Sequence, residues 1–163
     1  MDNSKGLSPL ASKEMKFVET TSSEIPIELL LEADPSEQSI LSYLESGLIF
    51  ATVRNEVAIG VCVVSLESET RAELFNISVS KEFQQQGVGT KLLEFVLQEL
   101  KSKGVKRLEL GTGTFGYQLA YYQRLGFRVD SVLKDYFVSH YPDPIFEQGI
   151  QLKDMLRLYL NLD

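Results

Sequence analysis

The chain has 163 residues, of which 44% are hydrophobic and 24% charged, so it is long enough for one globular domain with a substantial core. Its formal net charge of −7 argues against general nucleic-acid binding, which requires a basic surface. A single cysteine, Cys62, excludes a disulfide framework within the chain, and a single histidine, His140, excludes a multi-histidine metal site, so we expect no metal.

Hydropathy and the first residues bear on where the protein is located. No apolar run approaches the roughly 20 residues of a membrane span, and no apolar signal region is visible near Met1. We therefore expect a cytoplasmic protein with no membrane partner. Residues 1–14 are polar and lack periodicity, so we expect a flexible N-terminal extension there and a single domain over residues 15–163.

Hydrophobic periodicity in the first half of the domain predicts two short helices and three strands. Pro26 suits a first helical turn, and Gly47 follows the second helix as a helix end. The strand segments are rich in apolar and β-branched side chains, and Cys62 falls inside one of them as a buried structural thiol. In chain order, helices are expected over residues 26–33 and 35–44, followed by strands over residues 48–53, 57–66 and 72–79.

The second half alternates helices and strands. Val88, Leu92, Val96 and Leu100 form the apolar stripe of the first of these helices, and Gly104 follows it as a suitable helix end. Antiparallel strands followed by a strand–helix–strand–helix section predict an α+β domain. In chain order, we expect a helix over residues 88–103, a strand over 105–110, a helix over 117–125, a strand over 127–133, a loop over 135–149 and a last strand over 152–160.

The most informative motif joins the strand over residues 72–79 to the helix over residues 88–103. The first turn of a helix carries unpaired N–H donors, and the helix dipole adds partial positive charge there. Glycines in such a loop let the backbone come close to a ligand. The strand–loop–helix arrangement therefore predicts a binding site for a diphosphate. The motif reads Gln84-Gln85-Gln86-Gly87-Val88-Gly89-Thr90, with the spacing Gln-x-x-Gly-x-Gly.

Three families use such loops, and the residues separate them. A nucleoside-triphosphate loop ends in Gly-Lys-Ser/Thr, whereas here Gly89 is followed by Thr90 and Lys91. A dinucleotide fingerprint needs a third glycine, whereas position 92 is Leu92. The pattern instead resembles the acyl-CoA loop of the GNAT acetyltransferases, Gln/Arg-x-x-Gly-x-Gly/Ala. A second segment, Tyr-Tyr-Gln-Arg-Leu-Gly-Phe over residues 121–127, is similar to the Leu-Tyr-x-x-Leu-Gly-Phe segment that GNAT domains carry after their fifth strand.

This resemblance covers most of the chain and implies a fold and a co-substrate. The implied fold is a mixed, mostly antiparallel twisted sheet flanked by helices, with splayed central strands. The implied co-substrate is acetyl-CoA, whose pantetheine arm would pair with backbone groups of Ile77 and Val79, while plain core packing of these two residues is compatible with that role. Gln84 would support the loop. Backbone groups that would bind the pyrophosphate belong to Gln85, Gln86, Gly87, Val88, Gly89 and Thr90.

Acetyl transfer to an amine also needs a proton acceptor and a proton donor. By resemblance, Tyr122 is the tyrosine near the thioester sulfur and would protonate the departing thiolate, the alternative being an aromatic packing residue. Glu73 precedes the loop by the same number of residues as the catalytic glutamate does in histone-type GNAT enzymes. By this resemblance, Glu73 would accept the amine proton. The alternative for Glu73 is a solvent-facing carboxylate. Strand alternation places Glu73 on one face with Phe75, Ile77 and Val79.

Two further features concern the acceptor side. Tyr136 and His140 lie before the last strand, in a region that helps to shape the acceptor pocket in this family, and an ordinary loop histidine is the alternative for His140. Many family members carry an asparagine just after the fifth strand. Residues 111–116 contain none, so Thr112 or Thr114 would supply a hydroxyl instead.

The resulting hypothesis is an acetyl-CoA-dependent N-acetyltransferase. It would transfer the acetyl group to a primary amine of a small molecule, a peptide or a protein by direct attack in a ternary complex, because Cys62 is expected to be buried. The alternative is a non-catalytic acyl-CoA-binding regulatory module on the same fold, which would need neither Tyr122 nor Glu73. A homodimer is compatible with the resemblance, although no heptad pattern indicates one.

Overall fold

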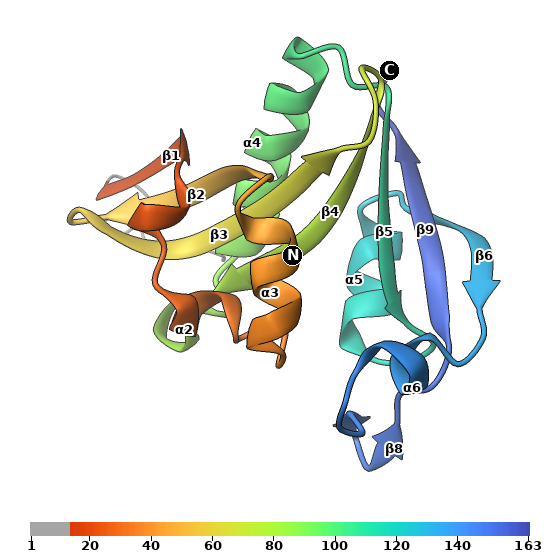
Figure 1. Ribbon diagram of the computed structural model, residues 1–163. Coiled ribbons are helices and arrows are strands. Elements are labelled where there is room, and N and C mark those ends of the chain that lie inside the picture. Colours follow the sequence, from red (N-terminus) through yellow and green to blue (C-terminus); the bar gives the residue numbers. More distant parts are fainter. Residues whose placement is uncertain (1–13) are drawn as a thin grey trace, which may run out of the picture. The chain divides into compact units, whose positions relative to one another are not determined.

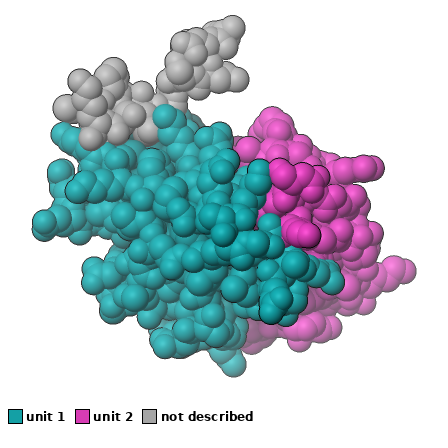
Figure 2. Space-filling view, turned by 90° about the horizontal axis from the view of Figure 1, so that it is seen from above, with its two compact units in different colours: residues 1–105 teal, residues 106–163 magenta. Residues whose placement is uncertain are grey.

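The computed structural model describes residues 14–163 of a chain that divides into two compact units, Met1–Val105 and Lys106–Asp163 (Figure 1 and Figure 2). Residues 1–13 of the expected N-terminal extension lie outside the described residues. Glu14, the last residue of that expected extension, directly precedes the first strand, and its Oε2 is 2.9 Å from Arg54 Nε. Each unit has its own strands and helices.

The first unit contains four antiparallel strands in the order β1-β2-β3-β4. Short 3-10 turns, Ser22–Glu24 and Lys81–Phe83, precede α2 and the glycine-rich loop. The predicted helices and strands of this unit are confirmed in type and order, and β1 is a strand that the sequence did not predict. The elements are β1 (Met15–Thr20), α2 (Ile27–Leu30), α3 (Glu37–Leu44), β2 (Leu48–Arg54), β3 (Val57–Leu66), β4 (Arg71–Val79) and α4 (Val88–Ser102).

Local signals explain several boundaries in the first unit. Asn55 and Glu56 have φ of 51° and 65°, the left-handed pair of a two-residue hairpin turn between β2 and β3. The Ser36 side chain accepts a hydrogen bond from Ser39 N at 3.1 Å and so caps α3. Helix α4 ends before Gly104, whose φ of +89° is a left-handed conformation that favours glycine.

Helices cover both faces of the β1–β4 strands. The ring of Phe95 on α4 meets the ring of Phe50 on β2 at a centroid distance of 6.1 Å, so α4 covers the face on which Phe50 lies. Helices α2 and α3 cover the opposite face, where Leu30 packs in one buried cluster with Val63 of β3. The predicted apolar stripe of α4 is confirmed as core, since each of its members is at most 1% exposed: Val88, Leu92, Val96 and Leu100.

The second unit contains three antiparallel strands in the order β5-β9-β6, together with two helices and a small hairpin. The predicted strands and the predicted helix after β5 are confirmed, and with the first unit they confirm the α+β class with mostly antiparallel strands flanked by helices. The elements are β5 (Arg107–Gly113), α5 (Tyr117–Arg124), β6 (Arg128–Leu133), α6 (Tyr136–His140), β7 (Phe146–Glu147), β8 (Ile150–Gln151) and β9 (Met155–Asn161).

The prediction of a loop over residues 135–149 was wrong, because this segment contains α6 and β7. Helix α6 is little more than one turn and is stabilised by stacking of the Tyr136 and His140 rings, whose centroids are 4.0 Å apart. Strand β7 pairs with β8 through a turn at Gln148 and Gly149, which have φ of 53° and 75°. Elements this short depend on contacts peculiar to the segment and leave no periodic pattern in the sequence.

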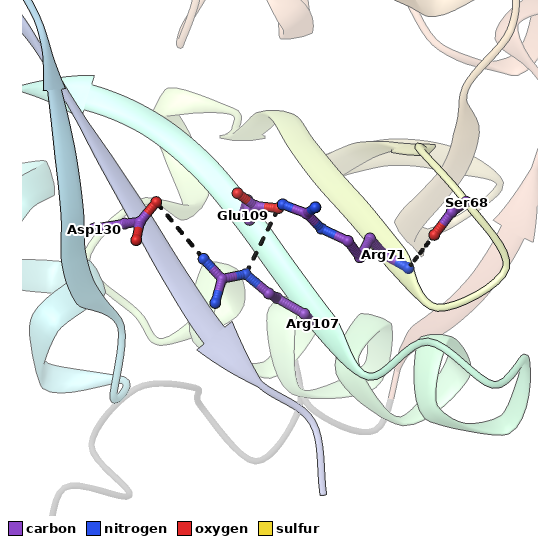
Figure 3. A network of polar contacts seen from close by, with 5 residues as sticks. All are labelled: Ser68, Arg71, Arg107, Glu109 and Asp130. Carbon is purple, nitrogen blue, oxygen red and sulfur yellow. Dashed lines mark hydrogen bonds and ion pairs between the residues drawn. The ribbon is translucent and has the colours of Figure 1, made fainter.

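An ionic network links the strands of the second unit (Figure 3). Arg107 Nε is 3.7 Å from Glu109 Oε2, and Arg107 Nη2 is 3.7 Å from Asp130 Oδ2, so β5 is joined to β6. The Arg107 guanidinium also lies 4.2 Å from the centroid of the Tyr159 ring on β9. The network therefore contacts all three strands of this unit, and we interpret it as structural.

Candidate functional site

The glycine-rich loop lies between β4 and α4 of the first unit, as predicted. Two of its glutamine side chains bond to backbone carbonyls nearby. Gln84 Nε2 donates to Val79 O at 2.8 Å, and Gln86 Nε2 donates to Glu82 O at 3.0 Å. The side chain of Gln84 therefore connects the loop to the end of β4, which is a physical basis for the supporting role that the resemblance implies.

The loop leads into an uncapped helix N-terminus. Gln85 and Gly87 have φ of 61° and 81°, and Gly87 occupies the N-cap of α4 without a side-chain hydrogen bond. The Lys91 N to Gly87 O bond of 3.1 Å starts the helical ladder, so the amides of residues 88–90 precede it. The first turn of this 15-residue helix carries no acidic residue. Amides that precede the helical ladder and the positive end of the dipole suit a phosphate group at this point.

Ile77 and Val79 lie on the α4 side of β4. They pair with Cys62 and Gly60 of β3, and a Cβ built on Gly60 would lie 3.5 Å from Leu92 Cδ2 on α4. Both residues are half-buried, so partial core packing is part of their role.

Burial also raises the pKa of the Cys62 thiol well above its ordinary value.

A β-bulge in β4 changes the expected position of Glu73. Val63 of β3 pairs with Asn76, but the adjacent Val64 pairs with Leu74, so Phe75 is an extra residue in β4. Residues paired across antiparallel strands lie on the same face, and faces alternate along β3. Glu73 therefore shares the α2–α3 face with Asn76. The prediction that Glu73 lies on one face with Ile77 and Val79 was wrong, because the extra residue reverses the alternation.

A buried polar cluster of Asp34, Tyr43, Asn76 and Ser78 was not predicted. Asn76 Nδ2 donates to Leu30 O and to Tyr43 Oη, both at 3.0 Å, and Ser78 Oγ donates to Asn76 Oδ1. Tyr43 Oη donates in turn to Asp34 Oδ2 at 3.1 Å. Asn76 and Ser78 each stand between apolar residues of β4, and that signal in the sequence could have identified them.

Tyr122 lies on α5 of the second unit and is only 6% exposed. Its ring packs edge-on against Phe127 at a centroid distance of 5.6 Å and against Tyr121 at 5.3 Å. Thr112 of β5 is also buried, and within the described residues its hydroxyl has no hydrogen-bond partner. Thr114, the other residue considered in place of the family asparagine, is exposed.

Tyr136 and His140, the predicted acceptor-pocket residues, are brought together on α6. Besides the ring stacking, His140 Nδ1 lies 2.9 Å from Tyr136 O. His140 is exposed, whereas Tyr136 is half-buried. The candidate residues thus belong to different units: the loop, Ile77, Val79 and Glu73 to the first, and Tyr122, Tyr136 and His140 to the second.

Two other features bear on the kind of site that the chain can form. Within residues 14–163, His, Cys, Asp and Glu side chains do not gather in groups of three or more that could hold a metal ion. Among the described helices, none combines the length and the apolar character needed to span a bilayer.

Known proteins resemble this chain over most of its length. The model of the acetyltransferase (GNAT) family matches residues 16–127. The uncharacterized N-acetyltransferase YvbK of Bacillus subtilis is 38% identical over 145 residues, which cover 88% of this chain and 93% of that protein. A crystal structure of a GNAT family acetyltransferase from Elizabethkingia anophelis with acetyl-CoA bound has a TM-score of 0.85 at 38% identity, covering 91% of this chain and 99% of that chain. The ribosomal protein bS18-alanine N-acetyltransferase of Escherichia coli is 37% identical over 67 residues, 40% of this chain and 45% of that protein.

Proposed function

This chain belongs to the GNAT family of N-acetyltransferases, and we propose that it transfers the acetyl group of acetyl-CoA to a primary amine by direct attack in a ternary complex. Its co-substrate is acetyl-CoA, which is bound in the similar Elizabethkingia enzyme. The observation that carries the proposal is the uncapped N-terminus of α4, which follows a loop with left-handed residues at Gln85 and Gly87.

The loop would bind the pyrophosphate through its backbone. The amides of residues 88–90 precede the helical ladder, and the N-cap has no side chain that competes for them. Charge-assisted bonds from backbone N–H groups to phosphate oxygens are among the stronger hydrogen bonds in proteins. The pantetheine arm would then run along β4 and pair with backbone groups of Ile77 and Val79, as an added strand does.

Transfer needs a neutral amine, because an alkylammonium group with a pKa of about 10.4 has no free lone pair at neutral pH. The ammonium group therefore loses one proton to solvent before the reaction, and we propose that Glu73 accepts the second proton, directly or through a water, as the neutral nitrogen attacks the thioester carbonyl carbon. The C–N bond forms and the carbonyl electrons move to oxygen. When they return, the C–S bond breaks and the electron pair leaves with the sulfur.

The departing thiolate needs a proton, since its conjugate thiol has a pKa of about 8.5. We propose that the Tyr122 hydroxyl donates this proton, which yields CoA and the N-acetylated amine, and that exchange with solvent then restores Tyr122 and Glu73. A covalent acyl-enzyme on Cys62 is disfavoured, because this thiol is fully buried and burial raises its pKa.

The acceptor would be a small-molecule amine or a peptide or protein amine. The name of the Escherichia coli relative specifies an alanine of ribosomal protein bS18, but its match covers 40% of this chain, so both classes stay open. We propose that Tyr136 and His140 contribute to the acceptor side, and that the buried Thr112 hydroxyl, for which the described residues offer no hydrogen-bond partner, replaces the family asparagine.

Calorimetric titration with acetyl-CoA tests the first part of this proposal, with ATP and NAD as controls. We expect acetyl-CoA to bind and both controls to give no heat of binding. A panel containing a polyamine, an aminoglycoside, a lysine-containing peptide and a peptide with a free N-terminus then tests transfer, with release of the CoA thiol as the readout.

The outcomes separate the alternatives. Acetyl-CoA binding with thiol release for one class of amine would support the proposal and identify the acceptor class. Binding without thiol release for any amine would favour the non-catalytic acyl-CoA-binding module. A protein that fails to bind acetyl-CoA would contradict the assignment of the loop.

A further inference from the structure

Every hydrogen-bonding group of the Asn76 side chain is used inside the first unit. Its two amide N–H groups donate to Leu30 O and Tyr43 Oη, and its carbonyl oxygen accepts from Ser78. The side chain is 2% exposed. Leu30 is the last residue of α2 and Tyr43 belongs to α3, so this one amide holds both helices against β4.

The cluster is closed by interactions beyond Asn76. The Tyr43 hydroxyl donates to the buried Asp34 carboxylate, and the Tyr43 ring stacks on the Phe75 ring with centroids 5.1 Å apart. Phe75 is the extra residue of the bulge. A satisfied polar network of this kind rigidifies its surroundings, because each member is costly to leave unpaired in a low-dielectric interior. Tyr43 thus contacts both the bulged residue and the amide that follows it.

The bulge decides which face Glu73 occupies. If β4 paired with β3 without an extra residue, a slip of one position would move Glu73 to the α4 face. If the segment after the bulge shifted by one position instead, Asn76 would move to the α4 face. Its amide would then lie in the apolar layer under α4 and lose the partners it has now. Burying an unpaired amide is unfavourable. The cluster therefore specifies the register that keeps Glu73 on the α2–α3 face.

We infer that Tyr43 and Asn76 are positioning residues for acetyl transfer: they hold the β4 bulge and so direct the Glu73 carboxylate to the α2–α3 face. This inference rests on the proposed role of Glu73 as the proton acceptor. The acetyl-CoA loop is held by separate bonds, from Gln84 to Val79 and from Gln86 to Glu82. Loss of the cluster should therefore lower turnover and leave acetyl-CoA binding intact.

A double-mutant cycle on the full chain tests the inference. The variants are Tyr43→Phe, Glu73→Gln and their combination, assayed for kcat and for KM of acetyl-CoA with the best amine of the panel. Tyr43→Phe keeps the ring that stacks on Phe75 and removes only the hydroxyl. Ser42→Ala on α3 is the matched control and should leave kcat unchanged, because within residues 14–163 the exposed Ser42 hydroxyl bonds only to Ser39 O in the same helix.

We expect Glu73→Gln to lower kcat by about 100-fold, the lower range for loss of a general base. Tyr43→Phe should lower kcat about tenfold in the wild-type background and change the KM of acetyl-CoA by less than about twofold. In the Glu73→Gln background, the same substitution should lower kcat by less than about a further twofold. Two residues that act through the same step are non-additive in this way. A purely structural effect would lower kcat equally in both backgrounds.

Each other outcome overturns a definite part of the reasoning. If Glu73→Gln retains full kcat, the role of Glu73 as base fails and the inference fails with it. If Glu73→Gln is slow but Tyr43→Phe acts equally in both backgrounds, the base stands and the positioning role is wrong. If thermal melting shows that Tyr43→Phe does not fold, Ser78→Ala replaces it in the cycle, because it removes one hydrogen bond to Asn76 and leaves Tyr43 in place.

Discussion

Replacement of Gly87 by alanine should weaken acetyl-CoA binding by more than its effect on stability explains. Gly87 has φ of 81° and ψ of 5° at the N-cap of α4. An L-residue in this left-handed conformation is less stable by roughly 1–2 kcal/mol, so we expect the free energy of unfolding to fall by about that amount. For a domain of this size, the melting temperature should fall by about 2–4 °C per kcal/mol.

The binding effect follows from the backbone amides. If the loop relaxes to relieve the strain that the Gly87→Ala substitution introduces, at least one amide turns away from the pyrophosphate. A hydrogen bond to a charged group contributes roughly 1.5–3 kcal/mol, and every 1.4 kcal/mol is about tenfold in Kd. We therefore expect the Kd of acetyl-CoA, measured by calorimetry, to rise by about tenfold to a hundredfold.

Gly104→Ala is the matched control for this variant. Gly104 lies at the other end of the same helix with φ of +89°, and a Cβ built there meets nothing within 4 Å. The loss of stability should therefore be similar, about 1–2 kcal/mol, with no change in the Kd of acetyl-CoA. Equal Kd values for the two variants would refute the assignment of the pyrophosphate to this loop.

Three further predictions concern other parts of the proposed site. Tyr122→Phe should lower kcat by about 100-fold or more with little change in acetyl-CoA affinity. Tyr121→Phe is its control and should keep a kcat near the wild-type value. Full activity of Tyr122→Phe would leave only a packing role for that ring. Gly89→Glu should abolish acetyl-CoA binding in calorimetry, because it adds bulk and negative charge beside the pyrophosphate, and unchanged affinity in a folded variant would contradict the loop assignment. Cys62 should resist alkylation by iodoacetamide at pH 8 in the native protein and react once the protein is unfolded in urea, since burial raises the pKa of its thiol; rapid native labelling would show that β3 opens.

The sequence predicted those elements whose pattern is long and local. Helix α4 has an apolar stripe over four turns and a glycine at its end, and both features are present in the structure. Helix α6 and the β7–β8 hairpin were missed, because five helical residues and a two-residue pairing carry too few positions for a period to be recognised. Their stability depends on contacts such as the Tyr136–His140 stacking, which propensity does not reveal.

In the candidate site, too, some features were predictable from the sequence and others were not. The loop was predictable because backbone amides bind a diphosphate, and backbone geometry requires glycine at a left-handed position such as Gly87. The face that Glu73 occupies was not predictable, because it depends on one extra residue in β4, and simple alternation along a strand does not show where such a bulge falls.

What does mark the bulge is the burial of polar groups around it. Asn76 and Ser78 are buried polar residues of β4, and a buried amide requires partners, so their presence indicates that other segments supply them. The partners are Leu30 O and Tyr43, which precede Asn76 by 46 and 33 residues in the chain and belong to two helices. Polar residues inside a predicted apolar strand are therefore the positions at which simple alternation is least reliable. In this chain, the strand register shifts beside Asn76, and Glu73, the proposed base, therefore lies on the α2–α3 face instead of the α4 face.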